Sequence, residues 1–366
     1  MAQSNDVDVT KLIQWIGNIL AMAVKAGASD IHFRAGHSPM IRVSGELLSM
    51  EQPAIDGNSL RIISERMTPA ALRKEAEELD QVDFSAEWQG TARFRVHRFR
   101  ERGEPALVLR LIPLKIPDFK TLRLPSSIKQ MAEFDRGLLL ITGATGMGKS
   151  TTIASLLAYM ANRRRRHILT IEDPIEFVIP PGQSMVSQRE VGRDVSDLTT
   201  GMWAALREDP DVIFLGETRD ADAVRVVLQA AETGHLVISA IHTVDVLGTI
   251  EHLINLFPSA EQQSARLRLA AVLQGVISQR LLPAKGTRTR ILASEVLLRS
   301  GGIQECIRKP ERTKSITERI AGAVSDGMHT FDQDLRRLFE AGVLDVEVAR
   351  SAASSPTDFM RNLHVM

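Results

Sequence analysis

The eight residues Gly143 to Ser150, which read Gly-Ala-Thr-Gly-Met-Gly-Lys-Ser, constrain this chain of 366 residues more than any other segment. They match the pattern G-x-x-x-x-G-K-[ST] without a gap. The apolar run Leu138 to Thr142 before them predicts a buried strand, and the apolar residues after them recur at helical spacing: Ile153, Leu156, Leu157 and Met160. A glycine-rich loop between a strand and a helix is typical of a phosphate-binding loop.

The residue types in this loop suit a nucleotide. Glycines let backbone N–H groups curl around phosphates, and the start of the following helix adds a partial positive charge. We expect Lys149 to reach the β- and γ-phosphates and Ser150 to hold magnesium, with ATP and Mg²⁺ as cofactors. The predicted binding residues are Gly143, Thr145, Gly146, Gly148, Lys149, Ser150 and Thr151.

Carboxylates follow two of the predicted strands. Short apolar runs bounded by Gly, Pro or charge predict a parallel sheet with crossover helices, and they are Leu138–Thr142, Ile168–Ile171, Val212–Leu215 and Leu236–Ile241. Ligands bind outside the carboxyl ends of such strands. We therefore predict that Glu217 holds the metal or polarises water. A second acidic cluster follows Ile171 and consists of Glu172, Asp173 and Glu176. Each cluster could instead cap the next helix.

Two histidines flank the last of these strands. His235 precedes Leu236 and His242 follows Ile241. A single histidine is more often structural, but a pair around one strand of such a sheet raises the possibility that they sense phosphate. Both remain candidates, His242 in catalysis and His235 in nucleotide binding.

The pattern before the loop differs from the pattern after it. An amphipathic helix ending at Gly27, two strands within 30–47, a helical stretch over 60–78 and β-rich runs at 93–99 and 107–112 predict a small α+β domain. Three prolines at 113, 117 and 125 suggest a linker. We predict an N-terminal domain at 1–112, a linker at 113–125, an ATPase core at 126–290 and a helical C-terminal region at 291–366.

Composition limits the function classes. Lys plus Arg and Asp plus Glu are both 45, so the zero net charge argues against a protein built to coat nucleic acid. The four arginines 163–166 are the strongest basic feature, and we expect them to close the helix after the loop. The single cysteine, Cys306, excludes an intramolecular disulfide and fits a cytoplasmic setting. The apolar stretch Leu12 to Val24 is too short to span a bilayer, so we expect membrane contact only through partners.

Four blocks taken together resemble the secretion ATPases of type II, type IV pilus and type IV secretion systems. They are Gly143 to Ser150 (Walker A), Ile171 to Glu176 (the Asp box), Leu206 to Arg219 (Walker B) and Thr233 to Leu236 with His242 (the His box). Within that superfamily nearly the whole chain resembles the PilT/PilU family of pilus retraction ATPases. Ala28-Ser-Asp-Ile-His32, Ile277 to Pro283 and Gly327 to Gln333 add to this resemblance.

The resemblance implies a PAS-like N-terminal domain, a RecA-like core and a homo-hexamer whose nucleotide lies between two domains. It further implies that Glu176 assists hydrolysis and that arginines from a neighbouring domain complete the site, with Arg95 and Arg110 at the family's spacing. Such arginines neutralise charge in the phosphoryl-transfer transition state. The implied partner is an inner-membrane platform protein of a pilus machine, contacted from the cytoplasmic face, and the implied work is pilus retraction.

Two departures from the family pattern bear on the direction of that work. Retraction ATPases usually carry Ala-Ile-Arg-Asn-Leu-Ile-Arg-Glu where this chain has Glu305 to Arg312, and Pro310 would break a helix there. His252 stands where an arginine is usual. A pilus-assembly or type II or type IV secretion ATPase therefore stays open as an alternative. A nucleic-acid motor, or a binding protein with a silent nucleotide site, is the alternative from another class.

Overall fold

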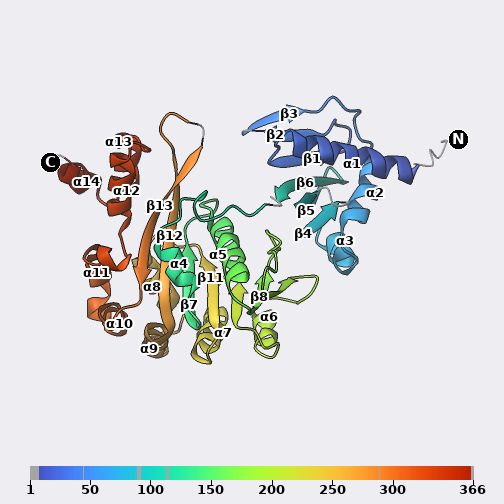
Figure 1. Ribbon diagram of the computed structural model, residues 1–366. Coiled ribbons are helices and arrows are strands. Elements are labelled where there is room, and N and C mark those ends of the chain that lie inside the picture. Colours follow the sequence, from blue (N-terminus) through green and yellow to red (C-terminus); the bar gives the residue numbers. More distant parts are fainter. Residues whose placement is uncertain (1–7, 44, 89–91, 113–114, 288, 364–366) are drawn as a thin grey trace. The chain divides into compact units, whose positions relative to one another are not determined.

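The computed structural model describes residues 8–43, 45–88, 92–112, 115–287 and 289–363 (Figure 1). They form two compact units. The first holds the described residues up to Lys115 together with 173–178 and 189–197, and the second holds 116–172, 179–188 and the rest of the chain from Leu198. Residues 113–114 of the predicted linker lie outside the described residues. The four predicted domain boundaries remain a prediction.

The first unit is built on a six-stranded antiparallel sheet of order β3-β2-β1-β6-β5-β4. Its strands are β1 (Asp30–Arg34), β2 (Met40–Val43), β3 (Glu46–Ser49), β4 (Gln81–Trp88), β5 (Ala92–Glu101) and β6 (Glu104–Ile112). On β5 the apolar residues alternate with arginines, and Phe94 and Val96 are fully buried. This period of two directs one face of the sheet into the core and leaves the other polar.

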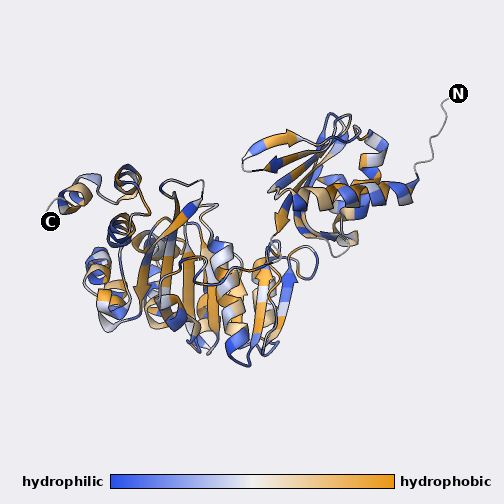
Figure 2. Ribbon diagram, turned by 45° about the horizontal axis from the view of Figure 1, so that its top comes forward, coloured by the Kyte–Doolittle hydropathy of each residue, from blue (hydrophilic) through white to orange (hydrophobic). Residues whose placement is uncertain are grey.

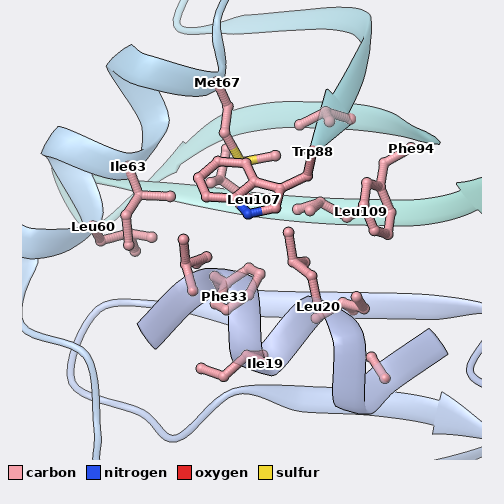
Figure 3. Close-up of a cluster of buried hydrophobic side chains, with 14 of the residues drawn as sticks. Ile19, Leu20, Phe33, Leu60, Ile63, Met67, Trp88, Phe94, Leu107 and Leu109 are labelled. Carbon is pink, nitrogen blue, oxygen red and sulfur yellow. The ribbon is translucent and has the colours of Figure 1, made fainter. Parts of the chain in front are cut away.

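Helix α1 (Val9–Lys25) covers the apolar face of that sheet. Asp8 caps the helix by accepting from the backbone N–H of Thr10 and Lys11. Its buried side chains, which include Ile19 and Leu20, pack toward Phe33, Leu107 and Leu109 of the strands (Figure 3). Burial of these side chains stabilises the unit by about 1.5 to 3 kcal/mol each.

The helical stretch predicted for 60–78 is two helices rather than one. Helix α2 (Gly57–Met67) ends at Thr68, which is extended, and Pro69 follows. A residue before proline is driven out of the helical region, so α2 stops there. A 3₁₀ turn, η1 (Ala70–Leu72), then leads into α3 (Arg73–Glu78).

The second unit is built on a seven-stranded sheet of order β13-β12-β7-β11-β10-β8-β9. The strands are β7 (Gly137–Thr142), β8 (His167–Glu172), β9 (Met185–Glu190), β10 (Val212–Leu215), β11 (Leu236–Ile241), β12 (Leu273–Pro283) and β13 (Arg290–Leu298). Strands β8, β10, β11, β7 and β12 run parallel, and β13 is antiparallel to β12. The central strands are buried on both faces and mostly orange in Figure 2, as expected for a parallel sheet covered by helices.

The helices that connect these strands are α4 (Ser127–Ala132), α5 (Lys149–Arg163), α6 (Leu198–Ala205), α7 (Ala221–Glu232), α8 (Val246–Asn255) and α9 (Gln262–Val272). Asp220 and Asp245 cap α7 and α8. The run of four arginines was expected to close α5, but only Arg163 belongs to that helix. Arg164 is extended and pairs with Glu133 and Asp135 in the segment before β7.

From Gly301 onward the chain is helical and lies beside β13 (red in Figure 1). Its elements are α10 (Gly301–Arg308), η2 (Pro310–Ser315), α11 (Ile316–Ala321), η3 (Val324–Asp326), α12 (Phe331–Glu340), α13 (Val346–Ala352) and α14 (Pro356–Leu363). Leu335 and Leu338 of α12 pack with Ile291 and Ala293 of β13 in a separate core cluster. Pro310 ends α10, as expected, and starts a 3₁₀ turn.

The sequence analysis did not predict four of the strands, namely β4, β9, β12 and β13. β13 occupies most of the first residues of the region that was expected to be helical. Among the described residues no helix is both long and apolar enough to cross a membrane.

Candidate nucleotide-binding site

The loop Gly143 to Ser150 leaves β7 at its carboxyl end and enters α5, as its sequence predicts. Gly143 has φ +146°, and a Cβ there would lie 2.7 Å from the backbone oxygen of Gln279 on β12. Only glycine tolerates both conditions, so the loop turns tightly against the neighbouring strand. Gly148, also left-handed, stands at the N-cap of α5.

Lys149 is buried although its side chain carries a charge. Its Nζ donates to the backbone oxygen of Gly143 at 2.7 Å and of Ala144 at 3.1 Å. It also lies 3.3 Å from Nδ1 of His242. The ammonium group is therefore held at the mouth of the loop, where the phosphates of a nucleotide would compete for its protons.

Glu217 follows β10, and His242 connects its side chain to Lys149 of the loop. Its Oε1 is 3.1 Å from Nε2 of His242, and its Oε2 is 2.7 Å from Nη2 of Arg219. Burial acts to raise the pKa of Glu217, but the hydrogen bond from Arg219 and the nearby His242 outweigh it and lower the pKa below its usual value. Glu217 is therefore an ionised acceptor at neutral pH.

The contacts of His242 assign its tautomer. A lysine ammonium can only donate, so Nδ1 of His242 accepts from Lys149. In the neutral ring the proton then sits on Nε2, which donates to Glu217. His242 thus connects the lysine of the loop to the carboxylate that follows β10.

The other loop residues expected to bind nucleotide lie at the tip of the loop and in the first turn of α5. Lys149, Ser150 and Thr151 form the first turn of α5, whose backbone N–H groups have no acceptor within the helix. Thr145 and Gly146 are exposed at the tip of the loop. Within the described part of the chain, no cluster of three or more His, Cys, Asp or Glu residues could hold a metal. The oxygen atoms of Ser150 and Glu217 are nevertheless of the kind that Mg²⁺ prefers when phosphates supply the remaining ligands.

The Asp box begins at the carboxyl end of β8. Glu172 is buried and accepts from Oγ1 of Thr170 at 2.6 Å and from Nε2 of Gln188 at 3.0 Å. Ile171 pairs with Leu215 of β10, so Glu172 ends its strand at the same edge of the sheet as Glu217. From Asp173 onward the Asp box belongs to the first unit.

The first unit brings together two of the predicted catalytic residues. Nη1 of Arg95 on β5 lies 3.6 Å from Oε1 of Glu176, and both side chains are about two-fifths exposed. Arg110 on β6 donates from Nε to Asp30 at 2.9 Å and is 70% exposed. Both guanidinium groups are thus accessible on the polar face of one sheet.

The structure places His235, a candidate for nucleotide binding, at the far end of its strand from the loop of its own chain. His235 precedes β11, and its backbone oxygen accepts from Gly137 at the start of β7. The loop and His242 lie at the other end of the same strands, about 20 Å away at the rise of an extended chain. The His235 ring contacts Ala230 and Thr233 at the end of α7, which is a structural role.

Several residues that support the loop were not identified from the sequence. Nη1 of Arg290 on β13 donates to the backbone oxygen of Gly146 at 3.2 Å. On β12, Ser278 bonds to Thr142 at 2.7 Å, and Nε2 of Gln279 donates to Thr152 at 2.7 Å. The available signal was the pair Ser278-Gln279 within an otherwise apolar run, because buried polar side chains need partners.

Comparisons with known proteins agree with this site. Residues 5–340 match the family model of type II/IV secretion system proteins. The type IV pilus retraction ATPase PilT of Pseudomonas aeruginosa is 40% identical over 94% of this chain and 99% of its own length. A twitching motility protein of Neisseria gonorrhoeae is 37% identical over 87% of this chain and 85% of its own. A crystal structure of the pilus retraction motor PilT with bound ADP matches with a TM-score of 0.88 and 39% identity, covering 94% of this chain and 99% of the other.

This likeness extends over both units and confirms the predicted fold class, an N-terminal α+β domain followed by a RecA-like core. The ADP-bound relative agrees with a nucleotide site of the kind that the loop predicts. The chain belongs to the type II/IV secretion system protein family and is an ATPase of its PilT branch.

Proposed function

We propose that this ATPase binds Mg-ATP at Gly143 to Ser150 and uses its hydrolysis to drive retraction of a type IV pilus. The observation that best supports hydrolysis is the connected set of Lys149, His242 and Glu217 at the carboxyl edge of one sheet. It places a cation for the phosphates beside a carboxylate that stays ionised. A protein that only bound nucleotide would not need the second group.

In the proposed mechanism Lys149 leaves the backbone oxygens of Gly143 and Ala144 and binds the terminal phosphates. Glu217 orients the attacking water and accepts its proton as the water oxygen bonds to the γ-phosphorus. The bond from that phosphorus to the β,γ-bridging oxygen breaks, and ADP leaves. His242 then loses its bond from Lys149 and can donate or accept at the phosphate. Ser150 would supply a ligand to Mg²⁺, which neutralises phosphate charge when bound.

The roles of Glu176, Arg95 and Arg110 belong to the same proposal. Arg95 already lies beside Glu176, and Arg110 is largely exposed. Exposed arginines can be lent to a phosphate site in an assembled ring, where they would stabilise the charge of the transition state. We propose a homo-hexamer in which each subunit supplies such groups to another.

The work done by the ring is proposed from the relatives. One is named a type IV pilus retraction ATPase and another a twitching motility protein, and each covers most of this chain. We propose that this protein acts in the cytoplasm at the inner membrane, on a platform protein of a pilus machine. Its membrane contact would come through that partner.

A second candidate is an assembly or secretion motor of the same superfamily. The region 305–312 supports this second candidate, because α10 ends at Arg308 and the chain continues as a 3₁₀ turn from Pro310. Glu305 there pairs with Lys309 and Arg312 on the surface. In cells, deletion of the gene decides between the two candidates: hyperpiliated, non-twitching cells indicate retraction, and cells without pili indicate assembly.

Lys149→Ala tests the ATPase itself. We expect turnover to fall at least about a hundredfold, because the substitution removes the ammonium group that lies at the mouth of the loop, 3.3 Å from Nδ1 of His242. Lys129→Ala, an exposed lysine of α4, is the matched control and should keep full activity. Phosphate release by the purified ring measures both. Turnover that survives in Lys149→Ala would contradict the proposed site.

A further inference from the structure

The side chain of Glu190, at the end of β9, accepts hydrogen bonds from three residues of the first unit. It is only 3% exposed. Its Oε2 accepts from Oγ of Ser85 at 2.5 Å, from Nη2 of Arg93 at 3.1 Å and from the backbone N–H of Ile175 at 3.1 Å. Its Oε1 accepts from the backbone N–H of Ser85 at 3.3 Å. Neither the sequence motifs nor the proposed mechanism uses this group.

Arg93 is the cationic partner of Glu190. Although β5 carries several arginines, the side chain of Arg93 is only 13% exposed. Its Nη2 donates to Oγ of Ser85 at 2.7 Å as well as to Glu190. Burying such a pair costs solvation, and an isolated buried pair adds little to stability. The pair therefore matters mainly for the segment that it holds in place.

What the pair holds is the Asp box. Ile175, which donates to Glu190, lies between Asp173 and Glu176. Arg93 and Arg95 are two residues apart on β5, so they share one face of the strand, and Arg95 contacts Glu176. One face of β5 thus contacts the Asp box directly through Arg95 and indirectly through Arg93, whose partner Glu190 accepts from Ile175.

The other end of the Asp box is fixed in the second unit. Glu172 is held there by Thr170 and Gln188, whereas Asp173 to Val178 belong to the first unit. The boundary between the two units therefore falls inside the acidic cluster. If one unit moves relative to the other, the backbone between Glu172 and the residues bound to β5 must change conformation.

We propose that Ser85, Arg93 and Glu190 form a clip that positions the Asp box for hydrolysis. The clip residues do not touch the nucleotide. They tie residues 173–176 to β4 and β5, so that domain movement changes where the Asp-box carboxylates stand. This inference rests on the proposed role of the Asp box in turnover.

The test is the double variant Arg93→Met/Glu190→Gln, which removes both charges without leaving one of them buried alone. We expect kcat to fall about tenfold because a carboxylate displaced by about 1 Å loses much of its effect. The dissociation constant of ADP should stay within about twofold, since the loop Gly143 to Ser150 is untouched. Hydrogen exchange of the amides in 173–178 should become faster.

Arg100→Met is the matched control. Arg100 lies on the same strand, and its ion pair with Asp80 is exposed on both sides. This variant should keep kcat and leave exchange in 173–178 unchanged. If the double variant does not fold, Ser85→Ala removes only one hydroxyl from the clip, and the same split between kcat and ADP binding is expected at smaller size.

Two results would overturn the proposal: an unchanged kcat in a folded double variant, or equal losses of kcat and ADP affinity. Glu176→Gln separates this failure from failure of the proposed function. If Glu176→Gln is slow and the clip variant is fully active, the clip proposal is wrong and the proposed function stands. If Glu176→Gln is fully active, the Asp box has no catalytic role, and the proposal that the clip positions it for hydrolysis fails as well.

Discussion

Two carboxylates at the same edge of the core sheet, the half-buried Glu217 and the buried Glu295, behave in opposite ways. Glu217 follows β10, beside the nucleotide loop. Glu295 lies on β13 opposite Ser278, which pairs in turn with Thr142 at the start of the loop. Burial by itself raises the pKa of both carboxyl groups. The pKa of Glu217 is nevertheless lowered, whereas that of Glu295 is raised to about 7.

The difference lies in their partners. Glu217 receives a hydrogen bond from Arg219 and lies beside His242. Glu295 is more deeply buried and accepts from the backbone N–H of Val246, while the charge of Asp245 nearby raises its pKa further. A carboxylate beside cations is kept ionised for chemistry. One that faces mainly a backbone amide is closer to a neutral structural group, which here joins β13 to the first turn of α8.

The variant Glu217→Gln tests this difference between the two carboxylates most strongly. If Glu217 acts through its charge, turnover should fall by about 10² to 10³. ADP should still bind, because Gly143 to Ser150 remain intact. Single-turnover hydrolysis and ADP titration measure the two effects. Glu78→Gln, which removes an exposed carboxylate of α3, is the control. Unchanged turnover in Glu217→Gln would place Glu217 with Glu295 as a structural group.

Glu295→Gln tests the other half of the comparison through stability. In the folded protein Glu295 keeps its proton up to a pH of about 7, but in the unfolded chain it loses the proton near the usual glutamate pKa of 4.5. Its contribution to stability is therefore full below pH 4.5 and is lost as the pH rises to about 7. Glutamine cannot ionise, and its oxygen can still accept from Val246.

We expect Glu295→Gln to flatten the fall in stability between pH 5 and pH 8 by on the order of 2 kcal/mol. Urea unfolding at several pH values measures this slope. Glu347→Gln, which removes an exposed carboxylate of α13, is the control. Equal flattening in both variants would show that burial of Glu295 is not the cause.

Neither group shows this difference in the sequence. The run ending in Glu217 was identified because an apolar strand followed by an acid has a recognisable pattern. Glu295 lies in Arg290–Leu298, an apolar run whose periodicity does not tell a buried strand from a helix. β13 was therefore placed in a helical region. The clip has the same difficulty, since Arg93 and Glu190 are far apart in the chain and only folding brings them together.

The position of His235 relative to the loop could have been predicted from the sequence. The strand Leu236–Ile241 was correctly predicted, and parallel strands bind ligands at their carboxyl ends. His242 follows the strand and His235 precedes it, so the direction of the chain alone separates them. The residues that needed the structure are those whose partners come from distant segments, such as Arg290 at Gly146.

Arg219→Ala is expected to give the smallest effect, and it tests which neighbour lowers the pKa of Glu217. It removes the hydrogen bond that lowers the pKa of Glu217, so burial should then dominate and the pKa should rise. Hydrolysis needs the ionised carboxylate and is lost as the pH falls through that pKa. The acid limb of the pH–kcat profile should therefore move to higher pH. At neutral pH the loss should stay below about fivefold, because Arg219 is 68% exposed and an exposed ion pair contributes about 1 kcal/mol or less. An acid limb that stays in place would show that His242 alone keeps Glu217 ionised, and the contrast with Glu295 would then rest on one histidine.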